Sequence, residues 1–226
     1  MEINFAEKLI ILYRIIGGVL IAAGILSCSN QHNKITTYYD LENKEIREIF
    51  TVRADSPSIR EGEYLLYGKE GNLVERRNYT HNLITDTLMK YYASGKVSEK
   101  TMFSNGIQDG QRRVFFESGP VMIIEHYSKG TFEGSYQSFY ENGNKKEEGQ
   151  YVNDKMSGKW LYYYDTGELK EEVYFENNVE NGPFISYYKS GKLKETGTYT
   201  DGLKTGEWKS FDEEGRLVTG AQEIGS

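Results

Sequence analysis

From residue 62 onward, the hydrophobic positions of the chain gather in short runs rich in aromatic and branched residues, and polar stretches containing glycine separate these runs. Residues 159–175, KWLYYYDTGELKEEVYF, show the pattern once. KWLYYY and ELKEEVYF have the composition of β-strands, and DTG has that of a hairpin turn. No long helical period occurs after residue 30. The pattern predicts a series of antiparallel hairpins.

The hairpin pattern repeats with a period of 24 residues. A turn glycine recurs at this spacing in seven copies: Gly71, Gly95, Gly119, Gly143, Gly167, Gly191 and Gly215. Nine residues before it stands a second glycine, which Asp86 replaces in one copy: Gly62, Gly110, Gly134, Gly158, Gly182 and Gly206. Between the hairpins recur residues that tolerate a positive φ: Asn82, Gly106, Gly130, Asp154, Asn178 and Gly202. Each unit therefore contains two strands and two turns.

Seven such units predict an all-β fold, a single elongated and twisted antiparallel meander of about fourteen strands in which each hairpin contacts its neighbours. We assign the repeats to residues 62–220, a degenerate capping copy and its loop to 38–61, and a tail to 221–226. Simple alternation places Glu171 on the same face as Leu169 and Phe175, so the pattern does not decide which face packs. Bulges at Gly149 and Gly197 would reset the alternation.

The first thirty residues contain an apolar run, Ile15–Leu26, preceded by the basic residues Lys8 and Arg14. The run is shorter than the roughly 20 apolar residues that a membrane-spanning helix requires, and its length is typical of a signal peptide. Ile25-Leu26-Ser27-Cys28 follows directly and resembles the lipobox of bacterial lipoproteins, in which the cysteine becomes the lipidated N-terminus.

We therefore predict a helical lipoprotein signal peptide at residues 1–27, a lipidated Cys28 and a polar tether at 28–37. An uncleaved anchor helix with an incidental cysteine is the alternative. Both interpretations deliver the repeats to the far side of a bacterial inner membrane, in the cell envelope, with a membrane anchor at the N-terminus.

Charge and composition narrow the classes of function. The formal net charge of −7 argues against nucleic acid as a partner, because phosphate binding requires clustered lysine and arginine. Cys28 is the only cysteine, so no intrachain disulfide forms. The three histidines, His32, His81 and His126, occupy unrelated positions of the repeat without metal-ligand spacing. We expect no metal, no cofactor and no catalytic residues.

Glutamates recur at equivalent positions of five copies: Glu75, Glu99, Glu147, Glu171 and Glu195. Lysines lie nearby, such as Lys170 and Lys194, so cross-strand ion pairs are one explanation. An acidic stripe that binds a cationic partner is the more specific alternative. Carboxylates of an enzyme on the sheet face form a third hypothesis, which we do not favour.

Tyrosine is the residue type in excess, with 19 copies. Tyr92, Tyr140, Tyr164 and Tyr188 each follow the aromatic residue that stands four positions before a turn glycine. Together with Trp160 and Trp208 they are the candidate binding surface, because tyrosine combines a large apolar area with a polar tip. Packing between hairpins is the other interpretation of these tyrosines.

The unit G-x-W-x-x-Y-Y-x-x-G-x-L-x-x-E, followed by Y-x-N-G, resembles the MORN repeat in its bacterial variant. One copy carries the likeness in Trp160, Tyr163, Tyr164, Gly167, Leu169, Glu171 and Asn177, and another in Trp208, Phe211, Gly215 and Leu217. Two copies depart from it, with Leu88 and Arg112 in the position of Trp160. The resemblance implies a membrane-associated or protein-binding scaffold, or the antitoxin component of a toxin–antitoxin system.

These observations lead to a non-catalytic, membrane-tethered repeat protein that binds a protein, peptidoglycan or another glycan on its curved aromatic sheet. An antitoxin or immunity-type protein that neutralises a toxin by direct binding is the alternative.

Overall fold

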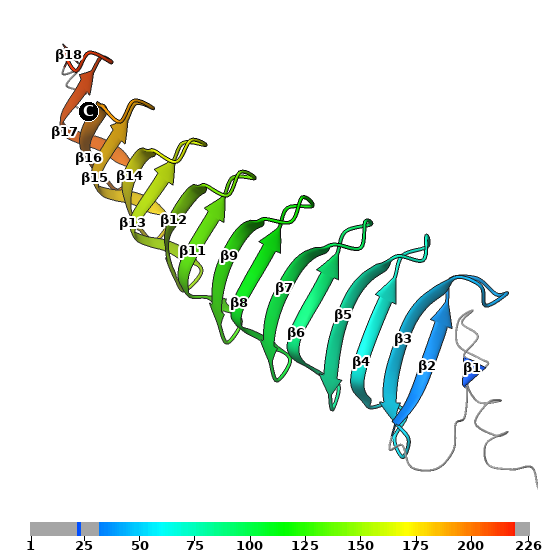
Figure 1. Cartoon of the computed structure of the whole chain (residues 1–226). Helices are drawn as coiled ribbons and strands as arrows, with labels where there is room; N and C mark the ends of the chain where they lie inside the picture. Colours follow the sequence, from blue (N-terminus) through cyan, green and yellow to red (C-terminus); the bar gives the residue numbers. More distant parts are fainter. Residues whose placement is uncertain (1–21, 24–31, 220–226) are drawn as a thin grey trace, which may run out of the picture. The chain divides into compact units, whose positions relative to one another are not determined.

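A computed structural model describes residues 22–23 and 32–219 of the chain. The described residues form eighteen β-strands and contain no helix, and therefore none that is long and apolar enough to cross a membrane. The chain divides into two compact units, residues 1–107 and 108–226. Strand pairing is antiparallel and joins successive strands within each unit, which confirms the predicted meander of hairpins (Figure 1).

The strands of unit 1 follow one another side by side from blue to green in Figure 1. Their bounds are β1 Ala22–Ala23, β2 His32–Tyr38, β3 Ile46–Arg53, β4 Arg60–Tyr67, β5 Leu73–Thr80, β6 Leu83–Tyr91 and β7 Val97–Ser104. The two residues of β1 pair with Thr36 and Ile35 of β2. From β2 onward, each strand pairs with the next.

Unit 2 continues the pattern through the green, yellow and red strands (Figure 1). The bounds are β8 Ile107–Phe115, β9 Val121–Ser128, β10 Thr131–Phe132, β11 Gly134–Phe139, β12 Lys145–Val152, β13 Lys155–Tyr163, β14 Leu169–Glu176, β15 Val179–Tyr187, β16 Leu193–Thr200, β17 Leu203–Phe211 and β18 Leu217–Thr219. Strands β10 and β11 both pair with β9, so together they fill the place of one strand.

From β4 onward, two kinds of turn alternate along the chain, at the positions that the sequence predicts. The seven turn glycines have φ between 79° and 118° and close five-residue loops, as where Gly167 N donates to Tyr164 O at 2.9 Å. The other turns have two residues, both with positive φ, such as Asn177 at 54° and Asn178 at 72°. These values define type I′ turns, whose twist matches that of the paired strands.

A bulge opposite Gly149 shifts the register between β12 and β13. Glu148 pairs with Leu161 and Gln150 pairs with Ser157, so three residues of β13 face the single residue Gly149 of β12. The same arrangement recurs opposite Gly197. Bulges at these glycines are confirmed, but their extra residues lie on β13 and β17, so the alternation along β12 and β16 is not reset and Glu147 shares a face with Tyr151. Asp86, the exception in the glycine series, also adopts a positive φ of 64°.

The packed face of unit 2 is a cluster of aromatic rings. Trp160 is surrounded by Tyr136, Tyr151, Tyr162 and Phe175, with ring centroids 5.3 to 6.4 Å apart. A Cβ added to Gly149 would lie 2.2 Å from the Trp160 ring, so the indole occupies the space that a side chain at 149 would take. Residues two apart on a strand share a face, which places Glu147 and Glu171 on this face as well.

The predicted tether at 28–37 is wrong for residues 32–37, which belong to β2 and pair with β3. Ile35, Thr36 and Thr37 are branched residues that suit a strand, and the unpaired edge of β3 accepts them. The region 38–61 predicted as a degenerate cap contains the end of β2, the turn 39–45, β3, the loop 54–59 and the start of β4. Apart from Ala22–Ala23, the signal helix at 1–27, Cys28 and the tail at 221–226 lie outside the described residues.

Candidate functional site

The two tryptophans of the predicted binding surface are core residues. Trp160 is 1% exposed and Trp208 is 7% exposed. Trp208 repeats the environment of Trp160, because it packs on Phe184 and Tyr199 and a Cβ at Gly197 would lie 2.2 Å from its ring. Their indoles therefore stabilise the sheet and present almost no surface to a partner.

The tyrosines of the predicted surface join one hairpin to the next. Tyr140 OH donates to Tyr163 O at 2.9 Å, Tyr164 OH to Tyr187 O at 2.8 Å, and Tyr188 OH to Phe211 O at 2.7 Å. All three are half-buried, and each ring reaches the following repeat from the end of a strand. Tyr92 occupies the equivalent place in its own copy. Tyr140, Tyr164 and Tyr188 therefore pack between hairpins, as the second interpretation of these residues predicts.

A continuous polar row crosses the ring-bearing face of unit 2, and we call it the carboxylate stripe. Its seven members lie on seven successive strands, each directly opposite the next: Ser138, Glu147, Tyr162, Glu171, Ser186, Glu195 and Ser210. Directly opposed residues of antiparallel strands have Cβ atoms about 5 Å apart, so neighbouring members of the stripe are within reach of one another.

Hydrogen bonds and burial hold the stripe in place. Glu147 Oε1 accepts from Ser138 Oγ at 3.0 Å and from Tyr136 OH at 3.1 Å. Burial, with the carboxylates of Glu147 and Glu171, raises the pKa of Tyr162 to about 12, so this hydroxyl stays protonated at neutral pH. The stripe is therefore a row of fixed hydroxyl groups and negative charges.

Charge compensation differs between the two units. In unit 1 the equivalent Glu75 and Glu99 are 15% and 14% exposed and pair with Arg77 at 3.1 Å and Lys90 at 3.2 Å. In unit 2 Glu171 and Glu195 are 31% and 28% exposed, and pair with Lys170 and Lys204. Glu147 forms no ion pair within the described residues. Four of the five glutamates form ion pairs, but the expected cross-strand pairing is confirmed only for Glu99 and Glu195, because Glu75 and Glu171 pair with residues of their own strands. The carboxylates of Glu171 and Glu195 are the more accessible.

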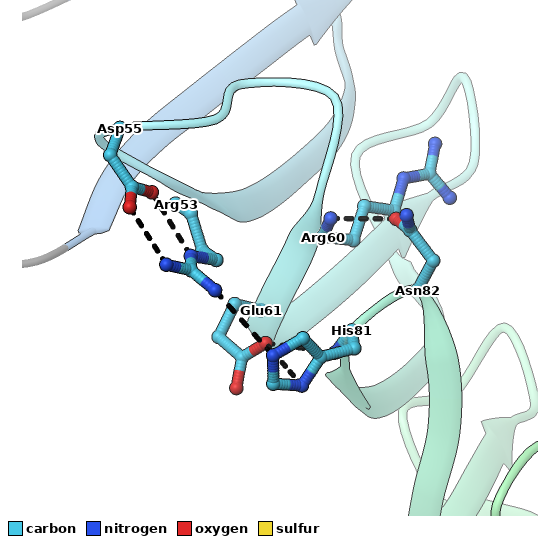
Figure 2. Close-up of polar contacts among 6 residues, drawn as sticks. All are labelled: Arg53, Asp55, Arg60, Glu61, His81 and Asn82. Carbon is cyan, nitrogen blue, oxygen red and sulfur yellow. Dashed lines mark hydrogen bonds and ion pairs between the residues drawn. The ribbon is translucent and has the colours of Figure 1, made fainter.

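Unit 1 has a polar hollow of about 370 Å³ beside the turn at His81. Figure 2 shows Arg53 bound bidentately to Asp55, with Nε–Oδ1 at 3.0 Å and Nη2–Oδ2 at 2.7 Å. His81 Nε2 lies 3.5 Å from Arg53 Nη1, and the backbone N of His81 donates to Glu61 Oε2 at 2.8 Å. Arg53, Asp55, Glu61 and His81 satisfy one another, so these contacts hold the loop after β3 to the turn between β5 and β6.

None of the described residues forms a group of histidine, cysteine or carboxylate side chains that suits a metal ion. His32 and His81 are exposed, as expected of surface histidines, whereas His126 is half-buried with Nδ1 2.9 Å from Ser135 O.

Sequence reasoning found the glutamates of the stripe but missed its hydroxyl members. Ser138, Tyr162, Ser186 and Ser210 recur at the same 24-residue spacing, so the signal was present. Their alignment with the glutamates depends on the strand register, which the bulges set. The sequence pattern did not decide which face each residue occupies, so this alignment was not predicted.

Three tandem segments of unit 2 match the family model described as MORN repeat variant, at residues 132–153, 156–177 and 180–201. These three hairpins are MORN repeat variants. Each matched segment spans one hairpin and ends on the first residue of a type I′ turn, as at Asn177. The matches contain the inner part of the carboxylate stripe, from Ser138 to Glu195. No curated protein matches the chain.

Proposed function

We propose that this chain is a non-catalytic repeat protein that binds a partner through the carboxylate stripe of unit 2. The partner is a protein or a cell-wall component that presents positive charges in an extended segment. The observation that carries the proposal is the row itself: Glu147, Glu171 and Glu195 lie on every second strand of one face, and no helix or second sheet is present among the described residues to cover them.

The spacing of the stripe favours an extended segment that crosses the strands. Two strand separations amount to about 10 Å, which is the length of about three residues of an extended peptide. In the extended polyproline II conformation, which has three residues per turn and rises about 3.1 Å per residue, a lysine or arginine at every third position stays on one side and would meet Glu147, Glu171 and Glu195 in turn. The intervening hydroxyl of Tyr162 is in place to hydrogen-bond the backbone or the sugar groups of such a partner, whereas Ser186 is 5% exposed and lies beneath the surface of the stripe.

Affinity capture from solubilised membranes, with the full-length chain as bait, tests this proposal. The triple variant E147Q/E171Q/E195Q removes the charges and keeps the shapes of the side chains. The matched control E176Q/E207Q/E213Q removes three exposed carboxylates elsewhere. We expect the same partner on the wild type and on the control, and its loss from the stripe variant. Equal capture by all three chains would refute the stripe as the binding surface.

The membrane tether is a further part of the proposal, supported by the lipobox-like Ile25-Leu26-Ser27-Cys28. We expect Cys28→Ser to accumulate as an uncleaved precursor that no longer incorporates labelled fatty acid. Normal processing of this variant would refute lipidation at Cys28. If the captured partner proves to be a toxin whose activity the wild type suppresses and the stripe variant does not, the function is that of an antitoxin or immunity protein.

A further inference from the structure

The backbone of Arg60, the first residue of β4, is fixed by two hydrogen bonds to Asn82. Its backbone N donates to Asn82 Oδ1 at 2.7 Å, and its backbone O accepts from Asn82 N at 3.1 Å. Equivalent positions three and four repeats later in the chain are Phe132 and Met156, of which Phe132 stacks on Tyr151 with ring centroids 3.9 Å apart. Arg60 therefore places a guanidinium in a position that three other copies fill with an apolar side chain, Ile84, Phe132 and Met156, and that Gln108, Glu180 and Lys204 occupy in the remaining three.

Three aromatic rings fix the guanidinium of Arg60. Its Cζ lies 4.9 Å from the centroid of Phe50, 5.3 Å from that of Tyr64 and 5.5 Å from that of Tyr79. Nη1 donates to Tyr79 OH at 3.4 Å, which is long for a hydrogen bond. In Figure 2 the guanidinium points away from the group formed by Arg53, Glu61 and His81. Cation–π contacts leave the N–H donors at the edge of the plane free for another acceptor.

The other arginines show how unusual this is. Six arginines among the described residues form ion pairs with carboxylates: Arg47, Arg53, Arg76, Arg77, Arg112 and Arg216. Within the described part of the chain, Arg60 and Arg113 have no such partner. Arg113 is exposed, whereas Arg60 is half-buried on its rings. In a chain with a net charge of −7, a fixed arginine without a counter-ion needs an explanation.

We propose that Arg60 is an anion-binding site that accepts a carboxylate or a phosphate group of a ligand or partner. A guanidinium binds such oxyanions through two parallel N–H···O bonds, and the three rings hold its plane before the anion arrives. Arg77 lies over the same two rings, 4.4 Å from Tyr64 and 5.3 Å from Tyr79, and adds positive potential although it pairs with Glu75. The site lies in unit 1 and is independent of the carboxylate stripe.

Titration of the full-length chain with inorganic phosphate and, separately, with acetate tests the site. The signals to follow by NMR are the backbone amides of Tyr79 and Asn82, which remain visible in every variant. We expect saturable shifts in the wild type with at least one of the two anions, and the anion that binds more tightly identifies the chemistry of the natural group.

Arg60→Phe installs the ring found at Phe132 and keeps the packing while it removes the donors. Arg60→Lys keeps the positive charge and loses the two parallel N–H donors of the guanidinium. We expect binding to weaken at least tenfold in R60F, several-fold in R60K, and not at all in the control R113Q. Shifts that do not saturate with either anion, or equal affinity in R60F and the wild type, would overturn the site. The titration contains no partner of the carboxylate stripe, so a negative result at Arg60 would not bear on the proposed function.

Discussion

At the scale of the residue, the core side chain of a repeat is matched in size to its neighbour on the preceding strand. Trp160 lies against Gly149 and Trp208 against Gly197, whereas Phe184 stands opposite Val173. A large ring therefore goes with a glycine and a smaller ring with valine. Arg112, which stands in the position of Trp160, binds Glu125 of the following strand through Nη1–Oε2 at 2.7 Å, so its charge is compensated on that side.

The pairing predicts the effect of Gly149→Val. The new side chain collides with the Trp160 ring, so we expect a loss of about 3 kcal/mol in the free energy of unfolding, measured by urea denaturation. The double variant G149V/W160F recreates the pair Val173–Phe184 and should recover most of this loss. Equal destabilisation of the single and the double variant would contradict the size matching.

Tyr162 makes the stability sensitive to alkaline pH. Its pKa of about 12 in the fold exceeds the ordinary value of 10, so between these values the unfolded chain releases a proton that the folded chain retains. Stability from this group is complete below pH 10 and falls as pH rises from 10 to 12. Tyr162→Phe should therefore show a shallower decline of the unfolding free energy over this range than the wild type, and an unchanged slope would contradict the assignment.

At the scale of the element, the turns do more than reverse the chain. In the type I′ turn 177–178, Asn178 N donates to Met156 O at 3.1 Å, and Asn178 Oδ1 accepts from Met156 N at 2.7 Å. Where glycine replaces the asparagine, as at Gly202, only the backbone bond to Glu180 O remains. One residue of the turn thus closes a hairpin and fastens it to the preceding repeat.

Asn178→Gly separates these two roles, because glycine keeps the positive φ and loses the side-chain acceptor. We expect the unfolding free energy to fall by about 1 kcal/mol and hydrogen exchange at the Met156 amide to accelerate. The Glu180 amide, opposite Gly202, serves as the internal control and should exchange at its original rate. If the Met156 amide is unaffected as well, the side-chain bond does not contribute.

The sequence was sufficient to predict elements but not the direction of side chains. The 24-residue spacing located both kinds of turn, because turn positions with a positive φ favour glycine, asparagine and aspartate. Strand β2 was missed because HNKITT is polar enough to resemble a tether, and only its pairing with β3 makes it a strand. The burial of Trp160 and the bonds of Tyr164 depend on register between repeats, which no single copy encodes.

At the scale of the whole molecule, the described hairpins of each unit are joined through their neighbours in sequence, by strand pairing in the middle and by turn contacts at the ends. In such an arrangement each repeat contacts only its neighbours, so the fold does not depend on one particular number of repeats. The same architecture leaves the carboxylate stripe uncovered by another layer in unit 2, and this is the feature from which the proposed function follows.

Deletion of one repeat tests this architecture most directly. Removal of residues 156–179 takes out 24 residues and joins Lys155 to Glu180, the counterpart of Met156 in the next copy. Removal of residues 156–167 is the control, because 12 residues break the register. We predict that the 24-residue deletion keeps the β-sheet circular dichroism spectrum and cooperative unfolding with a smaller m-value, and that the 12-residue deletion loses both. Loss of the fold in the two variants alike would contradict a structure built from neighbour contacts.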